Sequence, residues 1–120
     1  MAVGRLAAVT LDCANVEELA AFYVAAAGLE AVEVSEKGAF LSNGDGVAVA
    51  LQQVEGYRAP EWPGQTVPQQ LHLDLAVEDL AKAEAELLEL GASKPAEQPA
   101  EGKYLVLLDP AGHPFCAAVW

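Results

Sequence analysis

The chain contains one sequence pattern twice, and this internal repeat limits the folds that it can adopt more than any other feature. The first copy, AVTLDCANV, begins at Ala8, and the second, HLDLAVEDL, begins at His72. In each copy, alternating residues typical of a half-buried strand lead to an Asn or Asp and then to an alanine-rich helical segment. The repeat therefore predicts two similar modules, each beginning with a strand and a helix.

Landmarks of the repeat keep a nearly constant spacing along the chain. The expected helix N-caps, Asn15 and Asp79, are separated by the same interval as Ala8 and His72. Two further pairs of glycines keep almost this spacing, one pair at the expected helix ends and one pair in turns: Gly28 with Gly91, then Gly46 with Gly112. A spacing this regular indicates duplication.

The first module should contain four strands and one helix. Alternation predicts a strand over residues 6–13, and the cap-to-glycine segment 15–28 predicts the helix. Three short strands should follow at 31–34, 37–41 and 47–54, the last after an Asn-Gly-Asp-Gly turn at 43–46.

The second module should repeat this order after a segment rich in Pro and Gly at 55–70, which reads as a linker or a lid. We expect strands at 71–77, 104–108 and 115–120, a helix between Asp79 and Gly91, a weak strand at 93–99, and a type I turn at 109–112.

Length and composition favour one folded domain of 120 residues, with module one at about 4–54 and module two at 71–120. An apolar content of 53% is sufficient for a packed interior. No apolar run is long enough to span a membrane, and the first residues have no signal-peptide pattern, so we expect a cytoplasmic protein. Its two cysteines, Cys13 and Cys116, should then be free thiols.

The charge balance restricts the partners of the chain. Eighteen acidic and six basic residues give a net charge of −12, which would repel the phosphates of nucleic acids. The same charge would attract a cationic ligand. It is also compatible with a purely solubilising surface, and both interpretations remain open.

The repeated pattern resembles the vicinal oxygen chelate superfamily, which includes glyoxalase I, bleomycin-resistance proteins and extradiol dioxygenases. The resemblance is carried by segments 16–28, 71–80 and 108–115 and covers essentially the whole chain. It implies an α+β fold in which two tandem βαβββ modules form a curved half-barrel cup. It also implies a homodimer, and it places this chain among small bacterial glyoxalase-like proteins.

The resemblance also implies up to four metal ligands, on the first and last strands of each module. At those positions this chain has Ala8, His72, Ala50 with Gln52 two residues further on, and Cys116. Only His72, Gln52 and Cys116 carry a donor atom, and none of these is a carboxylate. We therefore expect no metal and no other cofactor, and a divalent ion such as Zn, Mn, Fe or Ni is the alternative.

Strand parity predicts which side chains line the cup. His72 and Asp74 share one face of their strand, and Thr10 and Asp12 share the matching face of the first strand. His72 and Asp74 are the catalytic candidates, because a carboxylate beside an imidazole could tune a general base. A purely structural polar pair is the competing interpretation. The expected ligand-binding set is Thr10, Asp12, Gln52, Trp62, His72, Asp74 and Cys116.

Aromatic residues in and beyond the linker allow two roles each. Trp62 and Tyr57 could stack on a flat or cationic ligand, or Trp62 could anchor the loop to the barrel or to a second subunit. Trp120 should fill a core or an interface. Cys116 should be a small buried residue.

The sequence thus favours a protein that binds a small organic molecule, cationic or aromatic, without the family's full metal site. Sequestration of an antibiotic is one form of this function. The alternative is a metal-dependent lyase, isomerase or dioxygenase that uses His72 with Gln52 or Cys116. Membrane and nucleic-acid partners are not expected.

Overall fold

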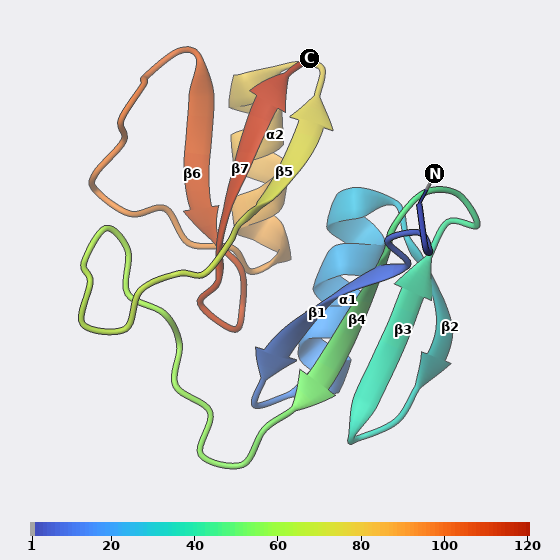
Figure 1. The fold of residues 1–120 in the computed structure, drawn as a ribbon. Helices are drawn as coiled ribbons and strands as arrows, with labels where there is room; N and C mark the ends of the chain where they lie inside the picture. Colours follow the sequence, from blue (N-terminus) through green and yellow to red (C-terminus); the bar gives the residue numbers. More distant parts are fainter. Residues whose placement is uncertain (1) are drawn as a thin grey trace. The chain divides into compact units, whose positions relative to one another are not determined.

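The computed structural model describes residues 2–120, and within them it contains seven strands and two helices (Figure 1). The chain divides into two compact units, Met1–Tyr57 and Arg58–Trp120. In chain order the elements are β1 (Ala8–Cys13), α1 (Val16–Ala27), β2 (Glu30–Val34), β3 (Gly38–Ser42), β4 (Ala48–Gln53), β5 (Leu73–Val77), α2 (Leu80–Leu90), β6 (Tyr104–Leu108) and β7 (Pro114–Val119).

The first unit is a four-stranded sheet with the strand order β1-β4-β3-β2 and with α1 packed on one face. β1 and β4 run parallel, whereas the other neighbouring strands are antiparallel. Alternate residues of the strands face the helix, because successive side chains of a strand point to opposite faces. The core of this unit includes Leu11, Cys13, Leu41 and Leu51 from the sheet and Val16, Leu19, Phe22 and Tyr23 from α1.

The second unit has the same design with one strand fewer. Its sheet has the order β5-β7-β6, in which β5 and β7 are parallel and β6 and β7 antiparallel. In Figure 1, α2 lies along one face of this sheet. The buried residues on that side include Ala83 and Leu87 of α2 and, from the strands, Leu105, Leu107, Phe115 and Ala117.

Both helices begin and end at the residues that the sequence predicts. The side-chain oxygen of Asn15 accepts a hydrogen bond of 3.0 Å from the backbone N–H of Glu18. Asp79 accepts an equivalent bond of 3.0 Å from the N–H of Lys82. The helices end at Gly28 and Gly91, both with positive φ. Neither helix is long and apolar enough to cross a membrane, and the structure has no other helix in residues 2–120.

Strand register confirms the internal repeat. Thr10 of β1 lies opposite Ala50 of β4, and Asp74 of β5 lies opposite Cys116 of β7. Thr10 and Asp74 have the same spacing in the sequence as the two helix caps, and Ala50 and Cys116 have that of the two turn glycines. The two parallel strand pairs are therefore equivalent parts of a duplicated module.

The weak strand predicted at 93–99 does not form, and this prediction is wrong. Only its first residue pairs with the sheet, through backbone hydrogen bonds in both directions between Ser93 and Leu108. Soon after it, Pro95 has no N–H to donate to a strand ladder. The second module is therefore βαββ in place of the predicted βαβββ.

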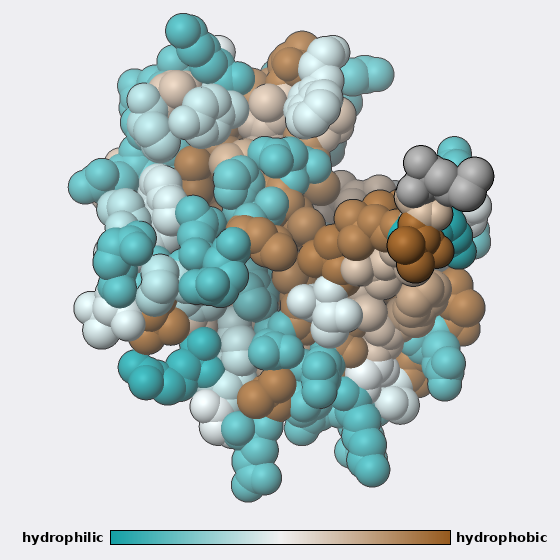
Figure 2. Space-filling model, in the orientation of Figure 1, coloured by the Kyte–Doolittle hydropathy of each residue, from teal (hydrophilic) through white to brown (hydrophobic). Residues whose placement is uncertain are grey.

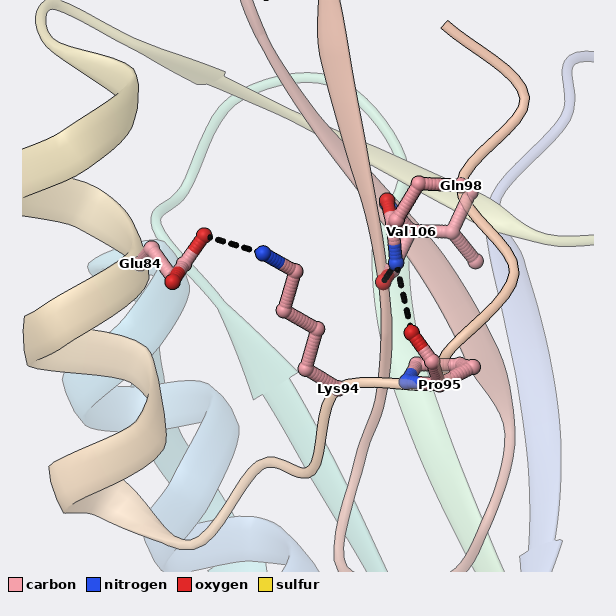
Figure 3. Close-up of polar contacts among 5 residues, drawn as sticks. All are labelled: Glu84, Lys94, Pro95, Gln98 and Val106. Atoms are coloured by element: carbon pink, nitrogen blue, oxygen red, sulfur yellow. Dashed lines mark hydrogen bonds and ion pairs between the residues drawn. The ribbon is translucent and has the colours of Figure 1, made fainter. Parts of the chain in front are cut away.

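A side chain replaces the missing strand (Figure 3). The Gln98 amide donates to the Val106 carbonyl at 2.9 Å, and its Oε1 accepts from the Val106 N–H at 3.0 Å. The same amide nitrogen lies 3.1 Å from the Pro95 carbonyl oxygen. Gln98 thus provides hydrogen-bond partners for the backbone N–H and carbonyl of Val106 at the outer edge of β6, as a neighbouring strand would.

Part of the 55–70 segment passes close to the turn between β6 and β7. The Gly112 N–H donates to the Asp109 carbonyl at 2.8 Å, as expected for the predicted type I turn. Gly112 has φ +88°, and a Cβ atom there would lie 2.7 Å from the Cβ of Ala59. The loop that carries Trp62 therefore passes directly over this turn.

Candidate functional site

A pocket of about 640 Å³ opens on the second unit. Its lining combines aromatic and aliphatic side chains with a few polar groups. The lining residues are Trp62, Gln69, His72, Asp74, Pro99, Tyr104, Val106, Pro114, Cys116, Ala118, Val119 and Trp120.

Strand alternation forms the floor of the pocket. Tyr104 and Val106 of β6 and Pro114, Cys116 and Ala118 of β7 line it, and each set is spaced two residues apart. The intervening residues of both strands are buried on the opposite face, where α2 packs. One face of the sheet is thus committed to the core, and the other is left for a ligand.

Two tryptophans flank this floor, and they are the only tryptophans in the chain. Trp62 comes from the 55–70 segment and is half-buried, whereas Trp120 follows β7 and is 83% exposed. Trp120 does not fill a core, because it lies beyond the end of β7 at Val119 and its side chain is exposed. The alternative expected role, filling an interface, stays a prediction.

His72 and Asp74 form a polar pair at one side of the pocket. The Nε2 atom of His72 lies 3.4 Å from Oδ1 of Asp74, and their side chains are 41% and 48% exposed. His72 immediately precedes β5, and Asp74 lies two residues further along the same strand face. The same-face arrangement predicted for this pair is present.

Cys116 lies next to this pair, because it is the register partner of Asp74 across the β5–β7 ladder. It is half-buried in the pocket wall, unlike Cys13, which is fully buried in the core of the first unit. Burial raises the pKa of the Cys116 thiol, and the negative charge of Asp74 raises this pKa further. Cys116 was predicted to be a small buried residue, and the structure buries it only in part.

Three other predicted ligand-binding residues belong to the first unit. Thr10, Asp12 and Gln52 are exposed, and Asp12 and Gln52 are register partners on β1 and β4. The pocket lining comes entirely from the second unit and includes none of them. The structure thus brings together four of the predicted residues: Trp62, His72, Asp74 and Cys116.

Comparison with known proteins identifies the fold. A family model described as a glyoxalase-like domain matches residues 8–118, which is nearly the whole chain. The chain belongs to this glyoxalase-like family. The α+β fold of vicinal oxygen chelate proteins predicted from the sequence is thereby confirmed.

Solved structures with the same fold have different functions. A glyoxalase-related enzyme from Fulvimarina pelagi is 20% identical with a TM-score of 0.70, over 98% of this chain and 89% of that one. A fosfomycin resistance protein from Mesorhizobium loti is 18% identical with a TM-score of 0.68, over 100% of this chain and 94% of that one.

A bleomycin-binding protein from Streptomyces verticillus, solved with copper(II)-bleomycin, is 17% identical with a TM-score of 0.61, over 100% of this chain and 99% of that one. No curated protein matches the chain. At these identities the solved structures show the fold of this glyoxalase-like domain and not its activity.

The resemblance noted in the sequence implies metal ligands at four strand positions, and the structure shows what this chain has there and nearby. Ala8 and Ala50 offer no side-chain donor at two of the expected positions. On the second unit, however, one donor atom each from His72, Asp74 and Cys116 lies within 4.8 Å of the others. A nitrogen, an oxygen and a sulfur ligand together fit Zn²⁺.

Sequence reasoning missed part of this site for identifiable reasons. The sequence alone does not place Asp74 beside Cys116, because the two residues are distant along the chain and only the strand register pairs them. Tyr104 and Val106 could have been found, since the parity argument used for 71–77 applies equally to β6. Gln69 lies in an irregular segment, where the sequence offers no such signal.

Proposed function

We propose that the pocket of the second unit binds a small organic molecule that has an aromatic body and a protonated amine. The observation that carries this proposal is the lining itself. Large aromatic residues border the pocket, while its polar groups include an acid, a hydrogen-bond acceptor and no lysine or arginine.

The size of the pocket suits a small organic ligand. A volume of about 640 Å³ lies within the roughly 300–1,000 Å³ of small-molecule sites. Trp62, Tyr104 and Trp120 supply flat faces on which an aromatic ring can stack. Covering Trp120, now largely exposed, would add apolar burial to the binding free energy.

The polar groups of the pocket favour a cation that donates hydrogen bonds. The carboxylate of Asp74 is its acidic group, and the chain carries a net charge of −12. In the part of the chain that the structure describes, Oε1 of Gln69 is buried with no hydrogen-bond partner. A buried acceptor without a partner is energetically unfavourable. A ligand N–H that bonds to Gln69 would therefore contribute more binding free energy than a ligand N–H that bonds to a solvated acceptor.

Antibiotic sequestration is a specific form of this proposal. Two proteins of the same fold are a fosfomycin resistance protein and a bleomycin-binding protein. Sequestration by this chain would require only that the pocket hold its ligand, without turnover.

Three naphthalene derivatives of similar size test the charge preference. Isothermal titration calorimetry on EDTA-treated protein should give the tightest binding for 1-naphthylmethylammonium, weaker binding for 1-naphthylmethanol and the weakest for 1-naphthylacetate. Asp74→Asn should weaken only the ammonium compound, by about two- to fivefold, as expected for an exposed ion pair of roughly 0.5–1 kcal/mol. Trp120→Ala should weaken all three.

A matched control is Glu78→Gln, which removes an exposed negative charge just after the end of β5 and outside the pocket lining. It should leave the three affinities unchanged. Equal binding of the ammonium and acetate compounds would contradict the proposed ligand class, and no binding of any of the three would contradict an aromatic ligand.

The second candidate function is a metal-dependent lyase, isomerase or dioxygenase. It is favoured by one observation, the group of donor atoms on His72, Asp74 and Cys116. A bound metal would act there as a Lewis acid on substrate oxygens. This candidate predicts a new product, detected by mass spectrometry, when metal-loaded protein is incubated with an α-ketoaldehyde and a thiol, or with a catechol and O₂, whereas a binding protein returns them unchanged.

A further inference from the structure

We propose that Gly112 is a positioning residue that sets where Trp62 and Gln69 lie in the pocket, although Gly112 does not itself line it. It does so by letting residues 59–69, here called the strap, pass directly against the turn between β6 and β7. The expected effect on ligand affinity rests on the proposed function, whereas the expected effect on Trp62 can be measured without any ligand.

The missing side chain of Gly112 makes room for the strap. A Cβ atom at this position would lie 2.7 Å from the Cβ of Ala59, which is closer than two such atoms can approach. Ala59 has no atom beyond Cβ that could rotate out of the way. Any side chain at position 112 would therefore force the backbone of the strap or of the turn to move.

The turn is the more firmly held of the two. Asp109 is 3% exposed, and its Oδ1 atom accepts hydrogen bonds from the backbone N–H groups of Ala111 at 2.9 Å and His113 at 3.0 Å. The N–H of Asp109 also donates to the His113 carbonyl at 2.9 Å. Ala59, in contrast, is exposed. A collision between the two should therefore displace the strap.

The strap is closed on itself, so a displacement at Ala59 should reach both of its pocket residues. The Glu61 N–H donates to the Val67 carbonyl at 2.6 Å, and Glu61 pairs with Pro68 in an isolated β-bridge. Trp62 directly follows one residue of this bridge, and Gln69 directly follows the other. The bridge thus couples the position of Trp62 to that of Gln69.

The internal repeat shows that this close approach is not a general requirement of the turn. Gly46 holds the place of Gly112 in the first module and also has a positive φ, +69° against +88°. A Cβ atom at Gly46 would meet no atom of the described residues within 4 Å. Both turns therefore need the backbone freedom of glycine, but Gly112 must in addition leave space for another segment.

The first test uses the free, full-length protein. The chain has two tryptophans, so a ¹H–¹⁵N spectrum should show two indole N–H signals, and Trp62→Ala identifies the signal that it removes. Gly112→Ala should shift the Trp62 signal. The matched control is Gly46→Ala, which introduces the same side chain at a positive φ without the collision, and it should leave that signal in place.

The second test measures affinity for 1-naphthylmethylammonium by calorimetry. Gly112→Ala should weaken binding by about two- to tenfold, the contribution of one aromatic contact. The same substitution made in the Trp62→Ala background should have a smaller effect, because only Gln69 is then left to be displaced. Gly46→Ala should bind as tightly as the native chain.

A rescue separates positioning from backbone strain. Ala59→Gly removes the colliding atom, so Gly112→Ala combined with Ala59→Gly should restore the Trp62 signal and the affinity. The loss of stability caused by a side chain at positive φ should remain. If Gly112→Ala fails to fold, Ala59→Val enlarges the same contact from the strap and keeps the glycine.

The proposal is overturned if the Trp62 signal stays in place in folded Gly112→Ala or Ala59→Val, or if Gly46→Ala shifts it equally. Failure of Ala59→Gly to restore the signal would also overturn it. If native protein does not bind 1-naphthylmethylammonium, the proposed ligand class fails, and the indole signals of the free protein still decide whether Gly112 positions Trp62.

Discussion

Cys116 lies at the centre of the pocket floor, with Asp74 as its register partner on one neighbouring strand and Val106 on the other. This position explains its chemistry. The apolar neighbour and partial burial disfavour a charged sulfur, and the carboxylate of Asp74 repels it. In the metal-free protein Cys116 should therefore be an unreactive thiol, in contrast to the activated cysteines of nucleophilic enzymes.

The reactivity of Cys116 provides a prediction at the scale of one residue. In metal-free protein, iodoacetamide should modify Cys116 more slowly at neutral pH than it modifies an exposed cysteine, because less thiolate is present. The pH midpoint of the reaction, followed by peptide mass spectrometry, should lie above the ordinary cysteine pKa. Asp74→Asn should lower this midpoint without restoring the ordinary value, since burial is the larger cause. A native midpoint at or below the ordinary value would contradict this account.

The same shift determines how Cys116 affects stability. The pKa of Cys116 is raised in the folded state. The contribution of the neutral thiol to the free energy of unfolding is therefore fully present below the ordinary cysteine pKa, and it is lost as the pH rises through the folded-state pKa. Urea unfolding at alkaline pH should therefore show a steeper loss of stability in native protein than in Cys116→Ser. Parallel pH profiles for the two proteins would count against the raised pKa.

The candidate site could be predicted only in part from individual residues. His72 and Asp74 follow from strand parity, and Trp62 follows from its place in a Pro- and Gly-rich segment. The juxtaposition of Asp74 with Cys116 could not be predicted in this way, because the two lie far apart in the sequence and only the β5–β7 register joins them. The unpartnered oxygen of Gln69 likewise depends on how an irregular segment packs.

At the scale of elements, the second unit differs from the first by the loss of one strand. Glu30 opposite Ser42 and Ser93 opposite Leu108 are equivalent pairs of the duplicated module, because they keep nearly the spacing of its other landmarks. The first unit continues from its pair into β2. In the second unit the chain turns away from the sheet near Pro95, and the Gln98 side chain then bonds to β6. An ion pair of 3.0 Å between Lys94 and Glu84 connects this segment to α2 (Figure 3).

Removing the Gln98 amide should therefore destabilise the second unit. Gln98→Ala leaves the N–H and carbonyl of Val106 without their partners, so we expect a loss of about 1–3 kcal/mol in urea unfolding. Hydrogen exchange of the Val106 amide should also become faster. Gln65→Ala is the control, because that side chain is exposed and its amide donates a hydrogen bond to the carbonyl of its neighbour Gly64. Equal stabilities of the two variants would show that Gln98 does not replace a strand.

Most elements were predictable from local sequence, and the one predicted strand that does not form, at 93–99, is absent for a local reason. Caps, terminal glycines and alternation located both helices and seven strands, since these signals act within a few residues. The segment 93–99 also carries a strand signal at its start, but a proline interrupts it and a side chain competes for the same hydrogen bonds. A side chain that takes the hydrogen-bonding role of a strand leaves no periodic signal in the sequence.

At the scale of the whole molecule, surface charge and oligomeric state set the conditions for binding. On the face seen in Figure 2, hydrophilic side chains cover much of the surface, and hydrophobic patches lie between them. A net charge of −12 should raise the local concentration of cations, and salt should screen this effect. The advantage of 1-naphthylmethylammonium over 1-naphthylmethanol should therefore shrink at high ionic strength.

A homodimer remains the expectation from the family resemblance. Sedimentation equilibrium at micromolar concentration should give twice the mass of the 12.5-kDa chain. A mass of one chain under these conditions would contradict the expected dimer, and it would leave the pocket unaffected because one unit supplies its whole lining.

The location of the bound amine is the most direct test of the proposed function. Titration of ¹⁵N-labelled, metal-free protein with 1-naphthylmethylammonium should shift the indole N–H signals of Trp62 and Trp120, because both tryptophans border the pocket. Backbone amides of β6 and β7 should shift with them, whereas those of the first unit should not. Saturable shifts confined to the second unit are the predicted result. Unchanged indole signals, or saturable shifts only in the first unit, would contradict the account.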